Sequence, residues 1–558
     1  MNYKGNLLII GVLVSLLSNG QLLEQKKKFT KADTLRGTVT TFREGWDVQH
    51  YDLNVAIDIT NKSIKGSNRI TYYESLAVKR MQIDLQQPLI IDSVVSDNGE
   101  KYGVENEGNV WFVRIRPDNM MVKLKPGIRR LTVYYHGIPK AAKQAPWDGG
   151  LVWKKDSKNN PFIGTACQGL GASIWWPCKD HQSDEPDSGM NISITAPDTL
   201  SAISNGRLKN ISASINGNKT WNWEVKNPIN TYAVTMNIGK YLNWADTLMG
   251  EDGELDLSYW VLAENLAKAK TQFTQVKPML RCFEYWFGKY PFYKDSYKLV
   301  EAPFLGMEHQ SAVAYGNAYQ NGYLGRDLSG TGWGLKWDYI IVHESGHEWF
   351  GNNITTKDIA DMWVHEGFTD YSETLYTQWL DGKQAGDEYV YGLRKNIANN
   401  ATIIGPYGVN EEGSGDMYYK GANLLHTIRN VINDDDKFRN IIRGLNKTFY
   451  HRQVTTNDVE NYISKESGIN FSKVFDQYLR TIKIPALEFY FSKKYKELSY
   501  RWANTVPGFN LNPVVKSGKG SIKFTPTEVW KTLKVRNVSV ADINSIEKDY
   551  YIFLKQVK

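Results

Sequence analysis

The sequence predicts a multidomain α+β protein, with an N-terminal antiparallel β domain, a mainly helical middle domain and a small C-terminal β-sandwich. The chain has 558 residues, more than one hydrophobic core usually organises. Short alternating segments fill residues 46–243 with no helical spacing between them. Helical spacing dominates from about residue 262 to residue 482, and alternation returns after it. We therefore expect three folded parts.

The first strands show the clearest alternation. In YDLNVAIDI, residues 51–59, every second side chain is apolar, as in a strand with one buried face. Similar runs at 69–73 and 129–137 are separated by Gly, Asn and Asp, which favours an antiparallel sheet. In KIPALEFYF, Leu487 and Phe489 alternate again. The predicted units are a signal peptide at 1–20, a linker at 21–45, and domains at 46–243, 244–483 and 484–558.

The N-terminus predicts an export signal. Lys4 supplies a positive flank, and the apolar run from Leu7 to Leu17 is too short to span a bilayer. Small residues then offer a cleavage site before Gln21, and no nearby cysteine could carry a lipid. No other segment is apolar enough to cross a membrane. We expect an exported protein, periplasmic or extracellular, without a stable membrane anchor.

Composition narrows the possible functions. The net charge of +7 is modest for this length, and the basic run Lys26–Lys28 falls in the predicted linker, so no nucleic-acid partner is expected. The three cysteines argue against a disulfide framework and against a cysteine-based zinc cluster. Pairing of Cys167 with Cys178 stays open for an exported protein. The sequence does not specify an oligomeric state.

The stretch VHESGHEWFGN, residues 342–352, indicates a metal site. Apolar spacing predicts a helix over 337–350, which puts His343 and His347 one turn apart on one face. Both imidazoles can then reach one ion. Glu344 projects beside them, where it suits a base acting on water better than a metal ligand. The alternative is a buried helix whose polar side chains are satisfied by protein partners.

A second predicted helix, residues 361–380, offers Glu366 as third ligand. Two histidines and one carboxylate leave a fourth zinc position open, which is the catalytic arrangement. His365 is a rival, because neighbours on a helix point about 100° apart and only one can face the site. Asp370 and Glu373 follow one and two turns later. They are expected either to hydrogen-bond a ligand histidine or to be solvated charges.

Four motifs together resemble the aminopeptidase N family of zinc metallopeptidases, which are gluzincins with the pattern HExxH-x18-E. HESGHEWFGN followed by Glu366 matches the metal motif, and WVHEGFTDYSE at 363–373 is similar to WLNEGFAxYxE. FLGMEHQ at 304–310 is similar to the GAMEN box, and YYKGA at 418–422 to YxKGA. Their order and separation also fit, so the resemblance covers most of the chain.

This resemblance implies a thermolysin-like, mainly helical catalytic domain between the two β domains. It implies one Zn²⁺ per chain, held by His343, His347 and Glu366. Glu344 would be the general base, and Tyr418, rather than Tyr419, would stabilise the oxyanion.

The resemblance also implies a substrate-binding set. Glu308, with Gln168, would bind the α-amine of the substrate, and Gly306 and Met307 would line the same region. Three departures from the family stand out: His309 and His365 each replace an asparagine, and position 168 is glutamine where many members have glutamate.

The expected function is therefore zinc-dependent removal of N-terminal residues from peptides with a free N-terminus. An endopeptidase fits poorly with an amine-binding Glu308, and an epoxide hydrolase like the related leukotriene hydrolase fits poorly with export. A non-catalytic peptide-binding relic is the remaining alternative, and the complete set of catalytic residues argues against it.

Overall fold

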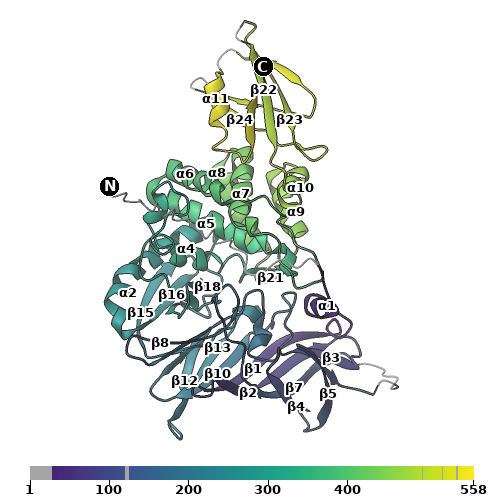
Figure 1. Cartoon of the computed structure of the whole chain (residues 1–558), viewed down its shortest axis with the longest axis vertical. Helices are drawn as coiled ribbons and strands as arrows, with labels where there is room; N and C mark the ends of the chain where they lie inside the picture. Colours follow the sequence, from purple (N-terminus) through teal and green to yellow (C-terminus); the bar gives the residue numbers. More distant parts are fainter. Residues whose placement is uncertain are drawn as a thin grey trace, which may run out of the picture.

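The computed structural model describes residues 28–117, 119, 125–492, 494–517, 520–535 and 538–557. The predicted signal peptide, 1–20, and the start of the predicted linker lie outside the described residues. The N-terminal β domain, the mainly helical domain and the small C-terminal β domain follow one another along the long axis (Figure 1). The predicted α+β fold class is confirmed.

The N-terminal domain contains a ten-stranded and a four-stranded sheet. Tyr51, Leu53 and Val55 are buried, as the alternation predicts. Pairing is antiparallel except between β1 and β10, which run parallel because a long connection separates them. In spatial order the large sheet comprises β12 (Arg207–Ile211), β13 (Asn218–Val225), β10 (Met190–Pro197), β1 (Trp46–Asp58), β2 (Ser63–Glu74), β7 (Gly127–Gly137), β4 (Ile90–Ser96), β5 (Lys101–Glu107), β6 (Val110–Arg114) and β3 (Arg80–Asp84). The small sheet comprises β11 (Ser201–Ile203), β14 (Asn237–Gly239), β9 (Pro161–Ala166) and β8 (Gly150–Lys155).

The helical domain begins with a five-stranded mixed sheet. Its order is β15 (Tyr241–Gly250), β16 (Gly253–Leu262), β17 (Tyr297–Glu301), β19 (Val313–Tyr315) and β18 (Gly306–Met307), so β18 is an edge strand. The helices are α2 (Leu266–Gln272), α3 (Val276–Phe287), α4 (Tyr339–Gly346), α5 (Trp363–Asp381), α6 (Lys383–Leu393), α7 (Tyr419–Ile432), α8 (Asp435–Thr448), α9 (Thr456–Ser467) and α10 (Ser472–Leu479). Strands β20 (Ile354–Thr356) and β21 (Arg452–Val454) pair in parallel.

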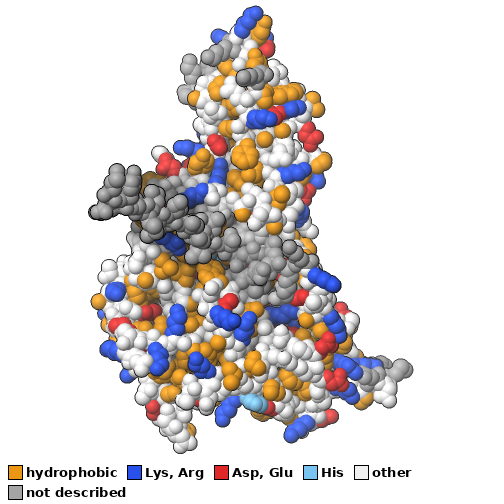
Figure 2. Space-filling view, in the orientation of Figure 1, with side chains coloured by type: hydrophobic (Ala, Val, Ile, Leu, Met, Phe, Trp, Pro, Cys, Tyr) orange, Lys and Arg blue, Asp and Glu red, His pale blue; other side chains and the backbone are white. Residues whose placement is uncertain are grey.

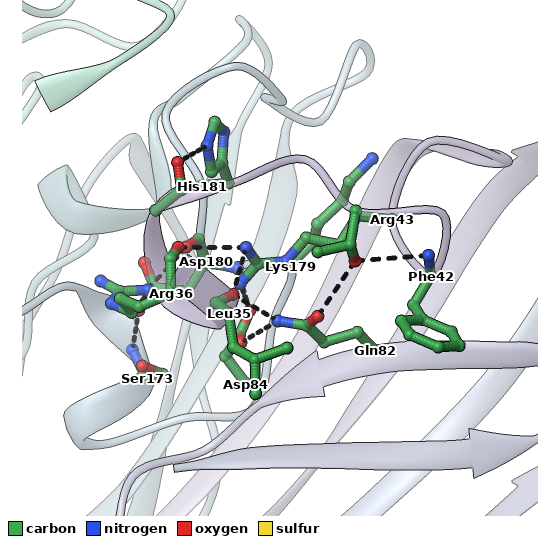
Figure 3. A network of polar contacts seen from close by, with 12 residues as sticks. Leu35, Arg36, Phe42, Arg43, Gln82, Asp84, Ser173, Lys179, Asp180 and His181 are labelled. Atoms are coloured by element: carbon green, nitrogen blue, oxygen red, sulfur yellow. Dashed lines mark hydrogen bonds and ion pairs between the residues drawn. The ribbon is translucent and has the colours of Figure 1, made fainter. Parts of the chain in front are cut away.

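The described end of the predicted linker folds against both large domains. It contains helix α1 (Lys31–Gly37), whose Arg36 guanidinium forms an ion pair of 2.7 Å with Asp180 (Figure 3). A Cβ on Gly37 would lie 2.1 Å from the carbonyl carbon of Val409, so the helix packs directly on a loop of the helical domain. Helix α1 therefore connects the N-terminal β domain to the domain that carries the metal motif.

The C-terminal domain is built mainly of strands. It comprises β22 (Ala486–Ser492), β23 (Glu497–Ala503), β24 (Val514–Ser517), β25 (Gly520–Lys523), β26 (Lys531–Lys534), α11 (Val540–Ser545) and β27 (Phe553–Gln556). The Tyr478 hydroxyl donates to the Tyr551 carbonyl oxygen at 2.7 Å, and the apolar core continues into the helical domain. The predicted boundaries at 243/244 and 483/484 stay predictions.

Three further features bear on the sequence predictions. Cys167, Cys178 and Cys282 are buried free thiols, so the first two do not pair. Among the described helices, none has both the length and the apolar character needed to cross a membrane. On the face in Figure 2, Lys and Arg are interspersed with Asp and Glu.

Candidate metal centre and substrate cleft

Helix α4 and the residue that directly follows it carry the first two predicted ligands. The Asp338 carboxylate caps it by accepting hydrogen bonds from two backbone amides of the first turn. The helix ends at Gly346, not at Phe350 as predicted, because the next residues close into tighter turns. His347 nevertheless keeps helical dihedrals, φ −63° and ψ −19°. The rings of His343 and His347 therefore stay neighbours, with centroids 5.0 Å apart.

The three predicted ligands converge. The Nε2 atoms of His343 and His347 lie 3.6 and 3.3 Å from Glu366 Oε2. Each Nδ1 is held from behind, by Glu373 Oε1 at 2.7 Å for His343 and by the Phe350 carbonyl oxygen at 3.0 Å for His347. If each Nδ1 donates there, both Nε2 lone pairs face the same point as the carboxylate. This buried donor set could hold a metal ion, and two histidines with one carboxylate fit Zn²⁺ with one position open.

His365, the rival ligand, turns away from this point. Its Nε2 accepts a hydrogen bond from the Thr356 backbone amide at 2.9 Å, and its ring stacks on Tyr232. Burial lowers the pKa of His365 to about 3, so the ring is neutral. Glu366 is therefore the residue of α5 that faces the histidines.

Asp370 and Glu373 are the two carboxylates predicted to hydrogen-bond a metal-binding histidine, and Glu373 does contact His343. Its second oxygen accepts a hydrogen bond of 2.6 Å from the Tyr389 hydroxyl, so the carboxylate is fixed from both sides. Asp370 lies close by but makes no hydrogen bond to His343 among the described residues. Burial and the neighbouring Glu373 raise the pKa of Asp370 well above its usual range, which keeps it protonated. Neither residue is a solvated charge.

Glu344 lies beside the edge strand β18. A Cβ built on Gly306 would come within 2.5 Å of Glu344 Oε1 and 2.9 Å of Ile340, so a side chain here would displace this carboxylate or its neighbour. Burial raises the pKa of Glu344 to about 8, which suits a group that takes up and releases a proton near neutral pH. Gly306 and Met307 line the same cleft as the ligands.

The predicted amine-binding residues occupy different places. Glu308 is 2% exposed, and its Oε1 makes no hydrogen bond to any described residue. Burial raises the pKa of Glu308. Gln168 instead donates from Nε2 to Glu366 Oε1 at 2.9 Å, so it holds a metal ligand from the N-terminal domain. Its role toward a substrate amine stays a prediction.

Tyr418 immediately precedes α7, and its ring stacks against His343 with centroids 6.1 Å apart. Burial and the surrounding glutamates raise the pKa of Tyr418 well above its usual range, so its hydroxyl keeps a proton to donate. Tyr419 lines the cleft as well. The geometry thus places Tyr418 against the ring of His343, and its role toward a substrate stays a prediction.

Sequence reasoning missed several side chains of the site. Tyr339 stacks on His343 and stands four residues before it, so helical spacing could have indicated it. No local pattern points to Trp147, Tyr323 or Tyr389, which come from separate segments. The ring of His309 is buried, and its nitrogens make no hydrogen bond to a described residue; burial lowers the pKa of His309 to about 3, so the ring is neutral.

Comparison with known proteins agrees with this geometry. Two family models match the chain: the peptidase M1 N-terminal domain over residues 47–233 and the peptidase family M1 domain over residues 272–478, together more than half of it. The chain belongs to peptidase family M1.

Among its M1 relatives, a probable aminopeptidase 2 of Sulfurisphaera tokodaii is 23% identical over 447 residues, 77% of this chain and 53% of the relative. Leukotriene A-4 hydrolase of Xenopus laevis is 22% identical, over 75% of this chain and 68% of the relative. The chain spans about half the length of most of the curated relatives it matches.

Solved M1 structures share the fold. A mutant M1 zinc metallopeptidase from Deinococcus radiodurans, bound to a Tyr-Ser-Ala substrate, superposes with a TM-score of 0.64 at 20% identity. The match covers 78% of this chain and 94% of that one. A two-domain M1 zinc metallopeptidase bound to L-tryptophan gives a TM-score of 0.63 at 21% identity, over 76% and 91% of the two chains.

Proposed function

We propose that this protein is an exported, zinc-dependent aminopeptidase that hydrolyses the first peptide bond of peptides with a free N-terminus. The observation that carries the proposal is Glu308. Its buried Oε1 has no hydrogen-bond partner among the described residues, yet it lies in the same cleft as the metal ligands. A free α-ammonium supplies both the charge and the N–H donors that such an oxygen lacks, whereas an internal peptide nitrogen carries no charge.

The edge strand β18 gives the substrate a direction. Its neighbour in the sheet is β19, so its other edge is available to pair with an extended peptide. Gly306 lies beside Glu344, and Glu308 follows two residues later. A peptide whose ammonium meets Glu308 therefore has its first carbonyl close to the metal ligands and Glu344.

Each residue of the site has a separate role in the proposed hydrolysis. When bound, Zn²⁺ supplies Lewis acidity, which lowers the pKa of water towards about 7 and polarises a carbonyl. Glu344 takes the proton of the attacking water and passes it to the leaving nitrogen. The Tyr418 hydroxyl donates to the developing oxyanion, and loss of one such donor costs about a hundred- to a thousandfold in rate.

Relatives support two reaction classes. Several curated relatives are named aminopeptidases, and one is named leukotriene A-4 hydrolase. The partnerless Glu308 oxygen favours peptides, because an epoxide offers no cation to it. Export rests on the N-terminal apolar run alone.

The test is hydrolysis of a panel of aminoacyl p-nitroanilides, each with and without N-acetylation. Wild type, Glu344→Gln and Glu308→Ala are compared, and the zinc content of every sample is measured. We expect release from free amines only, abolished in Glu344→Gln with zinc retained, and strongly reduced in Glu308→Ala.

Equal cleavage of the acetylated substrates would refute the aminopeptidase. No cleavage by a zinc-loaded wild type would favour the binding-protein alternative, and turnover of an epoxide substrate by that sample would favour the hydrolase alternative.

A further inference from the structure

The cleft has two chemically different ends, one on each side of the metal ligands. At one end, Glu308 approaches Glu344 and His347, with ligand atoms within 4.8 Å of one another. At the other end, aromatic rings continue outward from His343. Tyr339 stacks on His343 with centroids 5.1 Å apart, and Tyr323 meets Tyr339 edge-on at 5.2 Å. One end is thus acidic and the other aromatic.

The edge strand β18 fixes which part of a peptide reaches which end. A Cβ on Gly306 would lie 2.5 Å from Glu344 Oε1 and 2.9 Å from Ile340 Cδ1, so Gly306 stands at the reacting bond. An extended peptide advances about 3.3 Å per residue. With its ammonium at Glu308 and its first carbonyl near Glu344, its second residue passes Gly306 in the direction of Leu305 and Ile340.

The walls at this end of the cleft are apolar or aromatic. Tyr323 and Tyr339 lie there by their ring contacts, and Leu305, Leu328, Ile340 and Tyr419 line the same cleft. No carboxylate or ammonium group belongs to this set, and the Arg326 guanidinium lies 5.4 Å from the centre of the Tyr323 ring, so a cationic side chain there would lose water without gaining a partner. A large apolar side chain, by contrast, would bury its surface against these walls.

Tyr323 and Leu328 come from the irregular segment between β19 and α4, which is held in one shape. The Asn317 side chain donates to the carbonyl oxygens of Gln320 and Gly322 at 2.7 and 2.8 Å and accepts from the Leu324 amide at 2.8 Å. Leu324 itself has φ of +49°, a conformation that a leucine keeps only when its surroundings impose it. The wall is therefore in place before a substrate arrives.

We infer that Tyr323 and Leu328 are specificity-determining residues that select peptides with a large apolar second residue. This inference rests on the proposed function, because the direction of the peptide follows from an ammonium at Glu308. It concerns the residue after the cleaved bond and is separate from the preference for the first residue.

The test compares two dipeptide amides that share the first residue released fastest from the p-nitroanilide panel and carry either Phe or Gly second. The kcat/KM ratio is measured within each variant, so partial loss of folded protein cancels. Wild type should favour Phe by roughly ten- to two-hundredfold. Tyr323→Ala and Leu328→Ala should bring the ratio down to about threefold or less.

Leu324→Ala is the matched control. Leu324 belongs to the same segment but is 44% exposed and does not line the cleft, so this variant should keep the wild-type ratio. Tyr323→Phe retains the ring and should also keep it.

Equal kcat/KM for both amides in wild type, or an unchanged ratio in both alanine variants, would overturn the inference while leaving the aminopeptidase intact. Failure to cleave any free-amine substrate would overturn the proposed function, and this inference with it.

Discussion

Replacing Glu373 by glutamine tests how the metal centre is held. The carboxylate of Glu373 contacts two groups at once: His343 Nδ1 at 2.7 Å and the Tyr389 hydroxyl at 2.6 Å. Glutamine keeps the size but offers only one acceptor oxygen. With that oxygen on His343, the amide nitrogen faces the Tyr389 hydroxyl, whose proton loses its partner. With the side chain reversed, the glutamine amide N–H group faces the Nδ1–H group of His343, so two donors face each other and no hydrogen bond forms.

Either arrangement loosens the ligand ring without removing a ligand. Loss of such a supporting partner lowers metal affinity by about ten- to a hundredfold, or about 1.4 to 2.7 kcal/mol. We expect Glu373→Gln to fall in this range. Tyr389→Phe should lower the zinc affinity less than Glu373→Gln does, because the Glu373 carboxylate still contacts His343.

Zinc affinity is measured by competition with a chromophoric chelator of known affinity, with circular dichroism as a check on folding. Asp381→Asn is the control, because it makes the same chemical change at an exposed position of the same helix. A zinc affinity of Glu373→Gln within about twofold of both wild type and the control would refute the assigned role of Glu373.

Two further predictions concern other parts of the molecule. Gly306→Ala puts a Cβ 2.5 Å from Glu344 Oε1, so the carboxylate must shift, and kcat should fall by about a hundredfold with zinc content unchanged. Gly103→Ala is the control: its Cβ would meet only the Arg114 Cβ, at 4.0 Å, so kcat should stay intact. Glu185 is buried, and burial raises its pKa from 4.5 to about 7. The folded state therefore holds this proton more tightly, and stability falls as pH rises from about 4.5 to about 7. Glu185→Gln should remove that loss and gain up to about 3 kcal/mol over wild type at pH 8, with little difference at pH 4. Urea unfolding at both pH values measures this, and parallel curves for the two proteins would contradict it.

Much of the fold could be predicted because its signals are local. Alternation in YDLNVAIDI predicts strand β1, and the spacing of 361–380 predicts helix α5, since each pattern records within one segment which face of it is buried. The end of α4 was predicted four residues too late. Its apolar spacing continues through Phe350, but the backbone tightens after Gly346 to pack Trp349 and Phe350 into the core.

In the candidate site, too, some residues could be predicted from local spacing and others could not. The sequence by itself determined the pair His343 and His347, with Glu344 beside them, because their geometry depends on one helical turn. Only the tertiary structure decided that Glu366 rather than His365 faces them, because the rotation of α5 depends on what packs around it.

Contacts between distant segments also had to come from the tertiary structure. Gln168 reaches Glu366 across 198 residues of sequence, and Tyr323 joins the cleft from an irregular loop. No periodicity records such contacts, because they arise when segments far apart in the sequence pack against each other. The sequence therefore determined which side chains could share a metal site, and the packing of segments far apart in the sequence decided which other side chains line the same cleft.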